Sequence, residues 1–135
     1  MQINLETDYA VRIVDCFVCV ITRLDARTIA TRTGVTAGFA LKMLRKLAGA
    51  GIVRSFRGAK GGYVLAREPG EITLKQVMEA IDGPIVLAKC QSDIYTCDRP
   101  DGHPCSFQEI FLELSWEVSQ RLLKITFDCC NRYNK

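Results

Sequence analysis

Three cysteines lie close together in one polar segment of this 135-residue chain. Cys90, Cys97 and Cys105 are separated by six and seven residues, and Pro and Gly interrupt the segment around them. Because such a segment lacks the apolar period that would place thiols in a core, we expect these loop cysteines to serve chemistry. Three thiolates can converge on one soft metal centre, and the spacing leaves enough chain to wrap a cluster rather than a single small ion.

The charge distribution gives the two halves of the chain different expected partners. Residues 1–67 hold eleven Lys/Arg against four Asp/Glu, whereas residues 68–135 hold seven against eleven. A basic first half suits a polyanion, so we expect only this half to meet nucleic acid. The length predicts one compact domain with a real core and an appendage.

Hydrophobic patterning predicts neither export nor a membrane span. Arg12 and Asp15 interrupt the apolar run near the N-terminus, and no stretch is long enough to cross a bilayer. We therefore expect a cytoplasmic protein. In a reducing compartment, seven cysteines are better explained as ligands, sensors or core residues than as a disulfide framework.

Four of these cysteines lie outside the loop. Cys16 and Cys19 share one face of the first expected helix and are interpreted as small buried residues. Cys129 falls on the apolar stripe of the last expected helix, whereas Cys130 does not and is expected to be exposed and oxidisable. Neither of the last two is assigned as a ligand.

Apolar periodicity in the first half predicts three helices. Thr7-Asp8 can cap a helix over residues 8–22, whose apolar residues recur at three- and four-residue steps. A short helix over about 27–33 ends at the next glycine, and Thr36 can cap another over residues 37–48. A short helix, a tight turn and a longer helix form a helix-turn-helix.

Two strands joined by a basic turn follow the helices. Residues 52–56 and 63–66 are predicted strands, and the turn between them holds three glycines with Arg57 and Lys60. The glycines let the turn approach a groove, where the two cations can meet phosphates or a narrow minor groove. A helix-turn-helix followed by a basic hairpin is a winged helix, so double-stranded DNA is the expected partner. The residues expected to face it are Thr36, Ala37, Phe39, Lys42, Arg45, Lys46, Arg57 and Lys60.

The second half is expected to contain two further helices. Thr73 and Gln76 form a capping box that opens a helix to about residue 81. From Ser106, apolar residues recur at four- and three-residue steps through Ile125 to Cys129, which predicts a helix of about six turns. Its apolar stripe exceeds what one small core can cover, so we expect pairing with a second copy. The expected fold is mainly α with a small β-hairpin wing, and its parts are a DNA-binding domain at 1–84, a cysteine loop at 85–105 and a dimerisation helix at 106–135.

These motifs together resemble the Rrf-type winged-helix regulators, a family that includes IscR-like and NsrR-like iron–sulfur proteins. The resemblance covers nearly the whole chain. It implies a homodimeric bacterial transcription factor, not an enzyme, whose 2Fe-2S or 4Fe-4S cluster sets its affinity for an imperfectly palindromic operator. The similar stretches are Thr-Asp-Tyr-Ala-Val-Arg at 7–12, Leu-Arg-Lys-Leu-Ala-Gly-Ala-Gly-Ile-Val at 44–53, Arg-Gly-Ala-Lys-Gly-Gly-Tyr at 57–63, Ile-Thr-Leu-Lys-Gln-Val at 72–77, Ala-Ile-Asp-Gly-Pro at 80–84 and the loop cysteines.

The resemblance also implies roles for single residues. The loop cysteines match the family's three cluster ligands, and Arg57 matches a wing arginine that enters the minor groove. IscR-like members carry a histidine three positions after the third cysteine, where this chain has Gln108. In NsrR-like members an aspartate at the start of the first helix reaches the partner subunit's cluster, and Asp8 matches it, although the helix dipole also favours an acidic residue there. His103 is an alternative fourth ligand.

Three other hypotheses compete with a cluster-dependent regulator. The same DNA-binding protein could use its loop cysteines for structural zinc or for a thiol redox switch. A second hypothesis is a cluster-bearing electron carrier or enzyme. An electron carrier would not need a wing, and the sequence has no phosphate loop that would support an enzyme. A winged helix that binds only protein is a third.

In the cluster-dependent regulator, the two recognition helices of a dimer occupy successive major grooves, and the wings contact the flanking minor grooves. The proposed switch changes the separation of these two helices.

Overall fold

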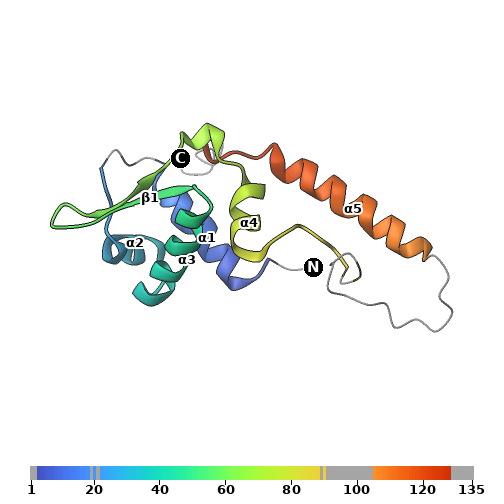
Figure 1. The fold of residues 1–135 in the computed structure, drawn as a ribbon, viewed down its shortest axis with the longest axis horizontal. Helices are drawn as coiled ribbons and strands as arrows, with labels where there is room; N and C mark the ends of the chain where they lie inside the picture. The colour runs from blue at the N-terminus through green and yellow to red at the C-terminus, as the bar shows by residue number, and fades with distance from the viewer. Residues whose placement is uncertain (1–2, 19, 21, 89, 91–104, 129–135) are drawn as a thin grey trace.

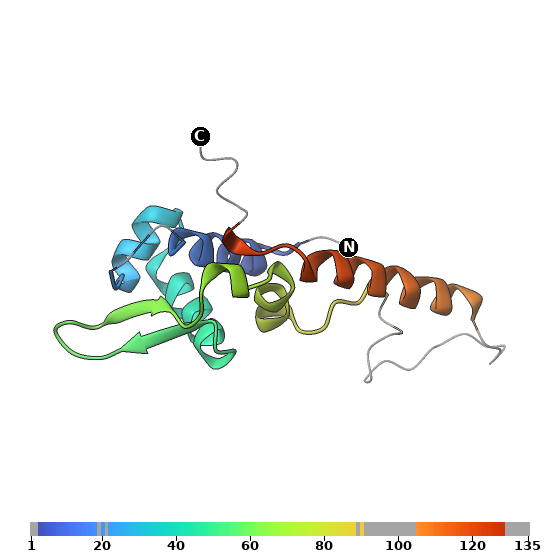
Figure 2. The ribbon, with the colours of Figure 1, turned by 90° about the horizontal axis from the view of Figure 1, so that it is seen from above.

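A computed structural model describes residues 3–18, 20, 22–88, 90 and 105–128 (Figure 1). The elements of this part of the chain are α1 (Leu5–Cys16), α2 (Ala26–Thr33), α3 (Ala37–Gly49), β1 (Val53–Phe56), β2 (Gly62–Leu65), the short 3-10 helix η1 (Pro69–Glu71), α4 (Leu74–Asp82) and α5 (Ser106–Leu123). The β1–β2 hairpin projects at one end of the molecule and α5 extends at the other, with α1 to α4 between them (Figures 1 and 2). The mainly α fold with a β-hairpin wing is therefore confirmed.

Helices α1 to α4 surround one hydrophobic core. Met43, Leu44 and Leu47 recur at one- and three-residue steps on α3 and are fully buried against α1 and α4. Ile13 and Val14 fill the facing side of α1. This core packs α3 against both α1 and α4.

Helix α1 is displaced from its predicted range of 8–22. Asn4 is its N-cap, because the Asn4 side-chain oxygen accepts a hydrogen bond from the Thr7 N–H at 2.8 Å. Thr7 lies inside the helix and is buried, so the prediction of a Thr7-Asp8 cap was wrong. Asparagine caps as well as threonine does, and here it begins the helix three residues earlier.

The remaining predicted caps are confirmed. The Thr73 N–H donates to Gln76 Oε1 at 3.0 Å, and the Gln76 N–H donates to Thr73 Oγ1 at 3.1 Å, which together form the capping box of α4. The helix ends at Asp82, and the following Gly83 has φ 78°. Local sequence signals therefore placed this helix correctly.

Helix α5 ends at Leu123, so the prediction of a helix that continues to Cys129 was wrong. After the helix, the Ile125 carbonyl accepts from the Leu74 N–H at 2.8 Å, and the Phe127 N–H donates to the Ile72 carbonyl at 3.2 Å. Phe127 then enters the core, where it is 2% exposed, so apolar residues follow the helix without continuing it.

The segment after α5 therefore packs against the core formed by α1 to α4 and does not continue the helix. Thr126 pairs with Thr73 in an isolated antiparallel bridge, which joins this segment to the start of α4. Cys129 and Cys130 lie outside the described residues, as does Cys19. Among the helices that the structure describes, none combines the length and the apolar character that a membrane span requires.

Candidate nucleic-acid interface

Helices α2 and α3 form the predicted helix-turn-helix. Asp25 caps α2, because its side chain accepts from the Thr28 N–H at 2.7 Å. Gly34 ends α2 in the left-handed conformation with φ 74°, which lets the chain turn tightly. Thr36 then caps α3 by accepting from the Phe39 N–H at 3.4 Å. The hydroxyl of Thr36 is thus already engaged at the exposed start of α3.

Helix α3 has one buried face and one exposed face. Ala37, Leu41 and Arg45 are exposed and follow each other at four-residue steps, so they share the outward face. Leu41 is 37% exposed at the centre of that face, and sequence analysis did not single it out. An apolar side chain in this position is suited to contact the methyl group of thymine in a major groove.

The two lysines predicted to face DNA contact an acidic residue of α1. Glu6 Oε1 lies 2.5 Å from Lys42 Nζ, and Glu6 Oε2 lies 3.3 Å from Lys46 Nζ. The hydrogen bonds from these lysines lower the pKa of Glu6 below its usual value of 4.5, and the one from Lys42 has the larger effect. Lys42 and Lys46 therefore lie on the side of α3 that faces α1, not on its outward face.

Phe39 also lies on the α1 side of α3. Its ring packs edge-to-face against Tyr9 with the centroids 5.8 Å apart, and it remains 40% exposed. Lys42 Nζ lies 6.0 Å from the Phe39 ring centroid. Phe39 is thus at the edge of the candidate interface, beside the first helix.

The wing presents the two predicted cations at its tip. The hairpin pairs Val53 with Leu65 and Phe56 with Gly62, which leaves Arg57 and Lys60 in the turn, both exposed. Within the described residues, neither Arg57 nor Arg45 forms an ion pair, so both guanidinium groups remain open to a phosphate.

The segment between α1 and α2 holds the wing in place. Leu24 and Tyr63 exchange two backbone hydrogen bonds of 3.0 and 2.8 Å, which adds a one-residue bridge to the edge of the hairpin. Arg23 Nη1 donates to the Lys60 carbonyl at 2.9 Å, and its guanidinium lies over the Phe56 ring. Arg23 therefore fixes the wing tip, a role that no local sequence signal indicated.

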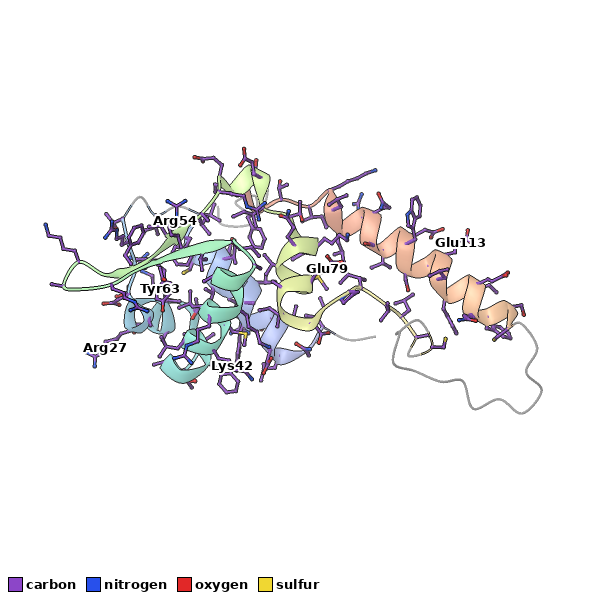
Figure 3. All side chains as sticks on the ribbon, viewed as in Figure 1. Arg27, Lys42, Arg54, Tyr63, Glu79 and Glu113 are labelled. Carbon is purple, nitrogen blue, oxygen red and sulfur yellow. The ribbon has the colours of Figure 1, made fainter. Side chains whose placement is uncertain are left out.

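Further exposed cations surround the predicted residues. Arg27 lies in the first turn of α2, and Arg54 lies on β1 next to the buried Val53. Figure 3 shows Arg27 and Lys42 on the lower side of α2 and α3, whereas Arg54 lies on the upper side of the wing. Arg54 could have been found from the inward–outward alternation of a strand, since Val53 at the preceding position is buried.

The cysteine loop is described only at its two ends. Cys90 and Cys105 are free, half-buried thiols, whereas Cys97 and His103 lie outside the described residues. Cys105 directly precedes α5 and makes no side-chain capping hydrogen bond. Among the described residues no group of three or more metal-ligating side chains comes together, but these include only two of the three loop cysteines.

Two other predictions concern α1. Asp8 Oδ2 lies 2.7 Å from Arg12 Nη2, so this carboxylate has an ion-pair partner within its own helix. Cys16 was predicted to be a small buried residue; it is half-buried and packs against the core, and this burial raises the pKa of its thiol.

Comparisons with known proteins point to one family. A family model described as "Rrf2: Iron-dependent Transcriptional regulator" matches residues 3–129. An Rrf2-like helix-turn-helix transcriptional regulator of Rhodobacter capsulatus is 35% identical over 108 residues, which are 78% of this chain and 72% of that protein. The transcriptional regulator IscR of Vibrio atlanticus is 32% identical over 98 residues, 73% of this chain and 55% of that protein.

A solved structure shows the same fold. CymR, the global cysteine regulator of B. subtilis, matches with a TM-score of 0.77 and 22% identity over 98% of each chain. At this identity the likeness concerns the fold. The winged helix and the long helix that follows it are therefore an arrangement shared with an experimentally determined structure.

Proposed function

The chain belongs to the Rrf2 family of DNA-binding transcriptional regulators, and from this premise we propose that it binds an imperfectly palindromic operator as a homodimer. Its relatives are named as transcriptional regulators, which is a non-enzymatic role. The observation that carries the proposal is the capped helix α3 with its exposed outward face, together with a wing whose turn holds two exposed cations.

DNA recognition follows from this arrangement. In each subunit the outward face of α3 enters a major groove, where Arg45 and Leu41 are placed to meet base edges. Arg57 and Lys60 at the wing tip enter the adjacent minor groove, where a narrow groove attracts cations. Thr36 and Ala37 lie at the start of α3, and the N-terminal residues of a recognition helix contact base edges.

The homodimer is supported by the apolar surface of α5. Ser115 is buried near residue 87, because its Oγ accepts from the Leu87 N–H at 2.9 Å. Helical spacing places two exposed apolar rows on either side of Ser115. The two rows lie on different faces of α5, and a second copy of the helix would cover one of them, as is usual for a contiguous apolar surface. The rows are Phe107, Ile110 and Leu114, and Leu112, Trp116 and Leu123.

An iron–sulfur cluster is the proposed cofactor of the loop. Cys90, Cys97 and Cys105 would hold it, and either His103 or Asp8 of the partner subunit would complete the set of ligands. The family model's description as iron-dependent supports iron, and the soft thiol donors suit a cluster. When bound, such a cluster supplies a centre that reacts with oxidants and nitric oxide.

The described residues offer a route from the loop to the DNA. Cys105 leads directly into α5, so a change in the loop acts on the first turn of this helix. The other end of α5 is fixed to the core by Phe127 and by the backbone pairing of residues 125–127 with the start of α4. A shift of α5 in the dimer therefore changes the separation of the two α3 helices.

DNA binding is tested with protein purified without oxygen. Duplexes selected from a random library should share a palindromic site, and affinity should fall steeply as salt rises. Arg57→Ala should weaken binding and reduce the salt slope by about one phosphate contact. Lys124→Ala, which removes one exposed cation at the C-cap of α5, is the matched control. Wild-type protein that binds no duplex in a salt-dependent manner would refute the proposal.

The cluster is tested by the visible spectrum together with iron and sulfide assays. Cys97→Ala should lose the colour and the iron, whereas Cys16→Ala should keep both because that thiol lies on α1. Operator affinity is then compared between cluster-loaded and cluster-free protein at one salt concentration. Protein that stays colourless after reconstitution would favour zinc binding or a thiol switch at the loop cysteines. Equal operator affinities of the cluster-loaded and cluster-free protein would refute regulation by the cluster.

A further inference from the structure

One carboxylate bridges two lysines at the junction of α1 and α3. Glu6 lies in the first turn of α1, whereas Lys42 and Lys46 lie one turn apart on α3. Each Glu6 oxygen contacts a different lysine, at 2.5 Å for Lys42 Nζ and 3.3 Å for Lys46 Nζ. The two contacts join residues that are 36 and 40 positions apart in the chain.

These contacts lie at the surface. The side chains of Lys42 and Lys46 are 52% and 37% exposed, and that of Glu6 is 32% exposed. Exposed ion pairs contribute little to folding stability, so stability is a weak explanation for this arrangement. A phosphate can reach the same ammonium groups, however, and would have to compete with Glu6 for them.

The position of the bridge matters because α3 carries only three cationic side chains. Arg45 lies on the outward face without an ion pair among the described residues, while the other two cations are held by Glu6. The Phe39 ring near Lys42 supports the same orientation toward α1. Glu6 thus divides the cations of α3 into one that is open and two that are engaged.

We propose that Glu6 is a specificity-determining residue, which restrains non-specific DNA binding by keeping Lys42 and Lys46 engaged. This inference rests on the proposed function, because it requires that α3 faces DNA. Non-specific binding depends almost wholly on lysines and arginines that neutralise phosphates. A lysine already paired with a carboxylate contributes less to this non-specific binding. Base contacts from the outward face of α3 are not affected, so an operator keeps its advantage.

The test is the salt dependence of binding to a fluorescent duplex of scrambled sequence. Glu6→Gln should tighten this binding and steepen the slope of log K against log salt by about one to two, because each freed lysine adds about one phosphate contact. Binding to the selected operator should tighten less, so the ratio of the two affinities should fall. Unchanged affinity and slope on the scrambled duplex, or an equal gain on both duplexes, would overturn the inference.

Two controls separate the bridge from net charge. Glu79→Gln removes a carboxylate that lies 3.5 Å from Lys75 on α4, so it changes the net charge equally without affecting α3. It should leave the slope unchanged. In a Lys42→Gln, Lys46→Gln background, Glu6→Gln should have no effect, and a persisting gain would overturn the bridge. If the wild-type protein binds duplex in a salt-dependent manner but Glu6→Gln changes nothing, this inference alone is refuted. If the wild-type protein shows no salt-dependent duplex binding, the proposed function is refuted as well.

Discussion

The guanidinium carbon of Arg23 lies 3.6 Å from the centroid of the Phe56 ring. The same group donates to the Lys60 carbonyl at 2.9 Å, so one side chain contacts both the end of β1 and the wing tip. An isolated two-stranded hairpin is only marginally stable in water. The orientation of this wing is therefore set by the segment between α1 and α2, which is itself joined to the hairpin through Leu24.

Removing the Arg23 side chain should loosen the wing. Arg23→Ala loses a cation–π contact and a hydrogen bond at an exposed site, worth about 0.5–1 kcal/mol for the former. We expect duplex affinity to fall roughly two- to fivefold and amide hydrogen exchange in residues 54–64 to become faster. Arg23→Lys keeps the charge without the planar group and should recover only part of the effect. Unchanged exchange in Arg23→Ala would contradict this positioning role.

A side chain at Gly62 should disturb the structure, whereas a side chain at Gly49 should be tolerated. A Cβ on Gly62 would lie 2.9 Å from the Leu24 carbonyl oxygen, and its φ of 137° disfavours other residues. Gly62→Ala should therefore displace the wing and weaken DNA binding. Gly49 is helical, and a methyl group added there would meet nothing within 4 Å, so Gly49→Ala should stabilise the fold by up to about 1 kcal/mol. Thermal unfolding and duplex titration of both variants test the contrast, and equal effects would contradict it.

Sequence signals predicted the elements whose ends are set locally. Gly34 and Thr36 delimit the helix-turn-helix, and the capping box of Thr73 and Gln76 begins α4, because each acts through neighbours within four residues. The extent of α5 could not be predicted in this way. Its apolar period continues into the following segment, and only the tertiary contact of Phe127 with the core shows that the helix has ended.

The candidate site shows the same division. The sequence predicted the basic residues of α3 and the wing, because composition and spacing reveal cations. It did not predict that Glu6 engages Lys42, or that Arg23 holds Lys60, since these partners are 36 and 37 positions apart. Which cations are open to DNA is thus a property of the packed structure.

Phe127 and Phe107 should report separately on the core and on the proposed dimer. Phe127 is buried, so Phe127→Ala should cost about 3–5 kcal/mol in the free energy of unfolding, measured with urea. Phe107 is 57% exposed on α5, so Phe107→Ala should leave the protomer folded and weaken the dimer in sedimentation. A stable Phe127→Ala variant would contradict the assignment of this segment to the core. An unchanged dimer in Phe107→Ala would remove this part of α5 from the proposed interface.

The cap of α2 should make stability depend on acid. Hydrogen bonds from Thr28 lower the pKa of Asp25 below its usual value of 3.8. The bond from the Thr28 side chain has the larger effect, and the bond from its backbone the smaller. Because the folded pKa is the lower one, the stabilisation is complete above the unfolded pKa and is lost as the pH falls through the folded pKa. Asp25→Asn can still cap α2 but does not titrate. The difference in unfolding free energy between wild type and Asp25→Asn should therefore be constant near neutral pH and change in favour of the variant below about pH 4. Parallel stability curves down to pH values below this would show that the Asp25 charge does not stabilise α2.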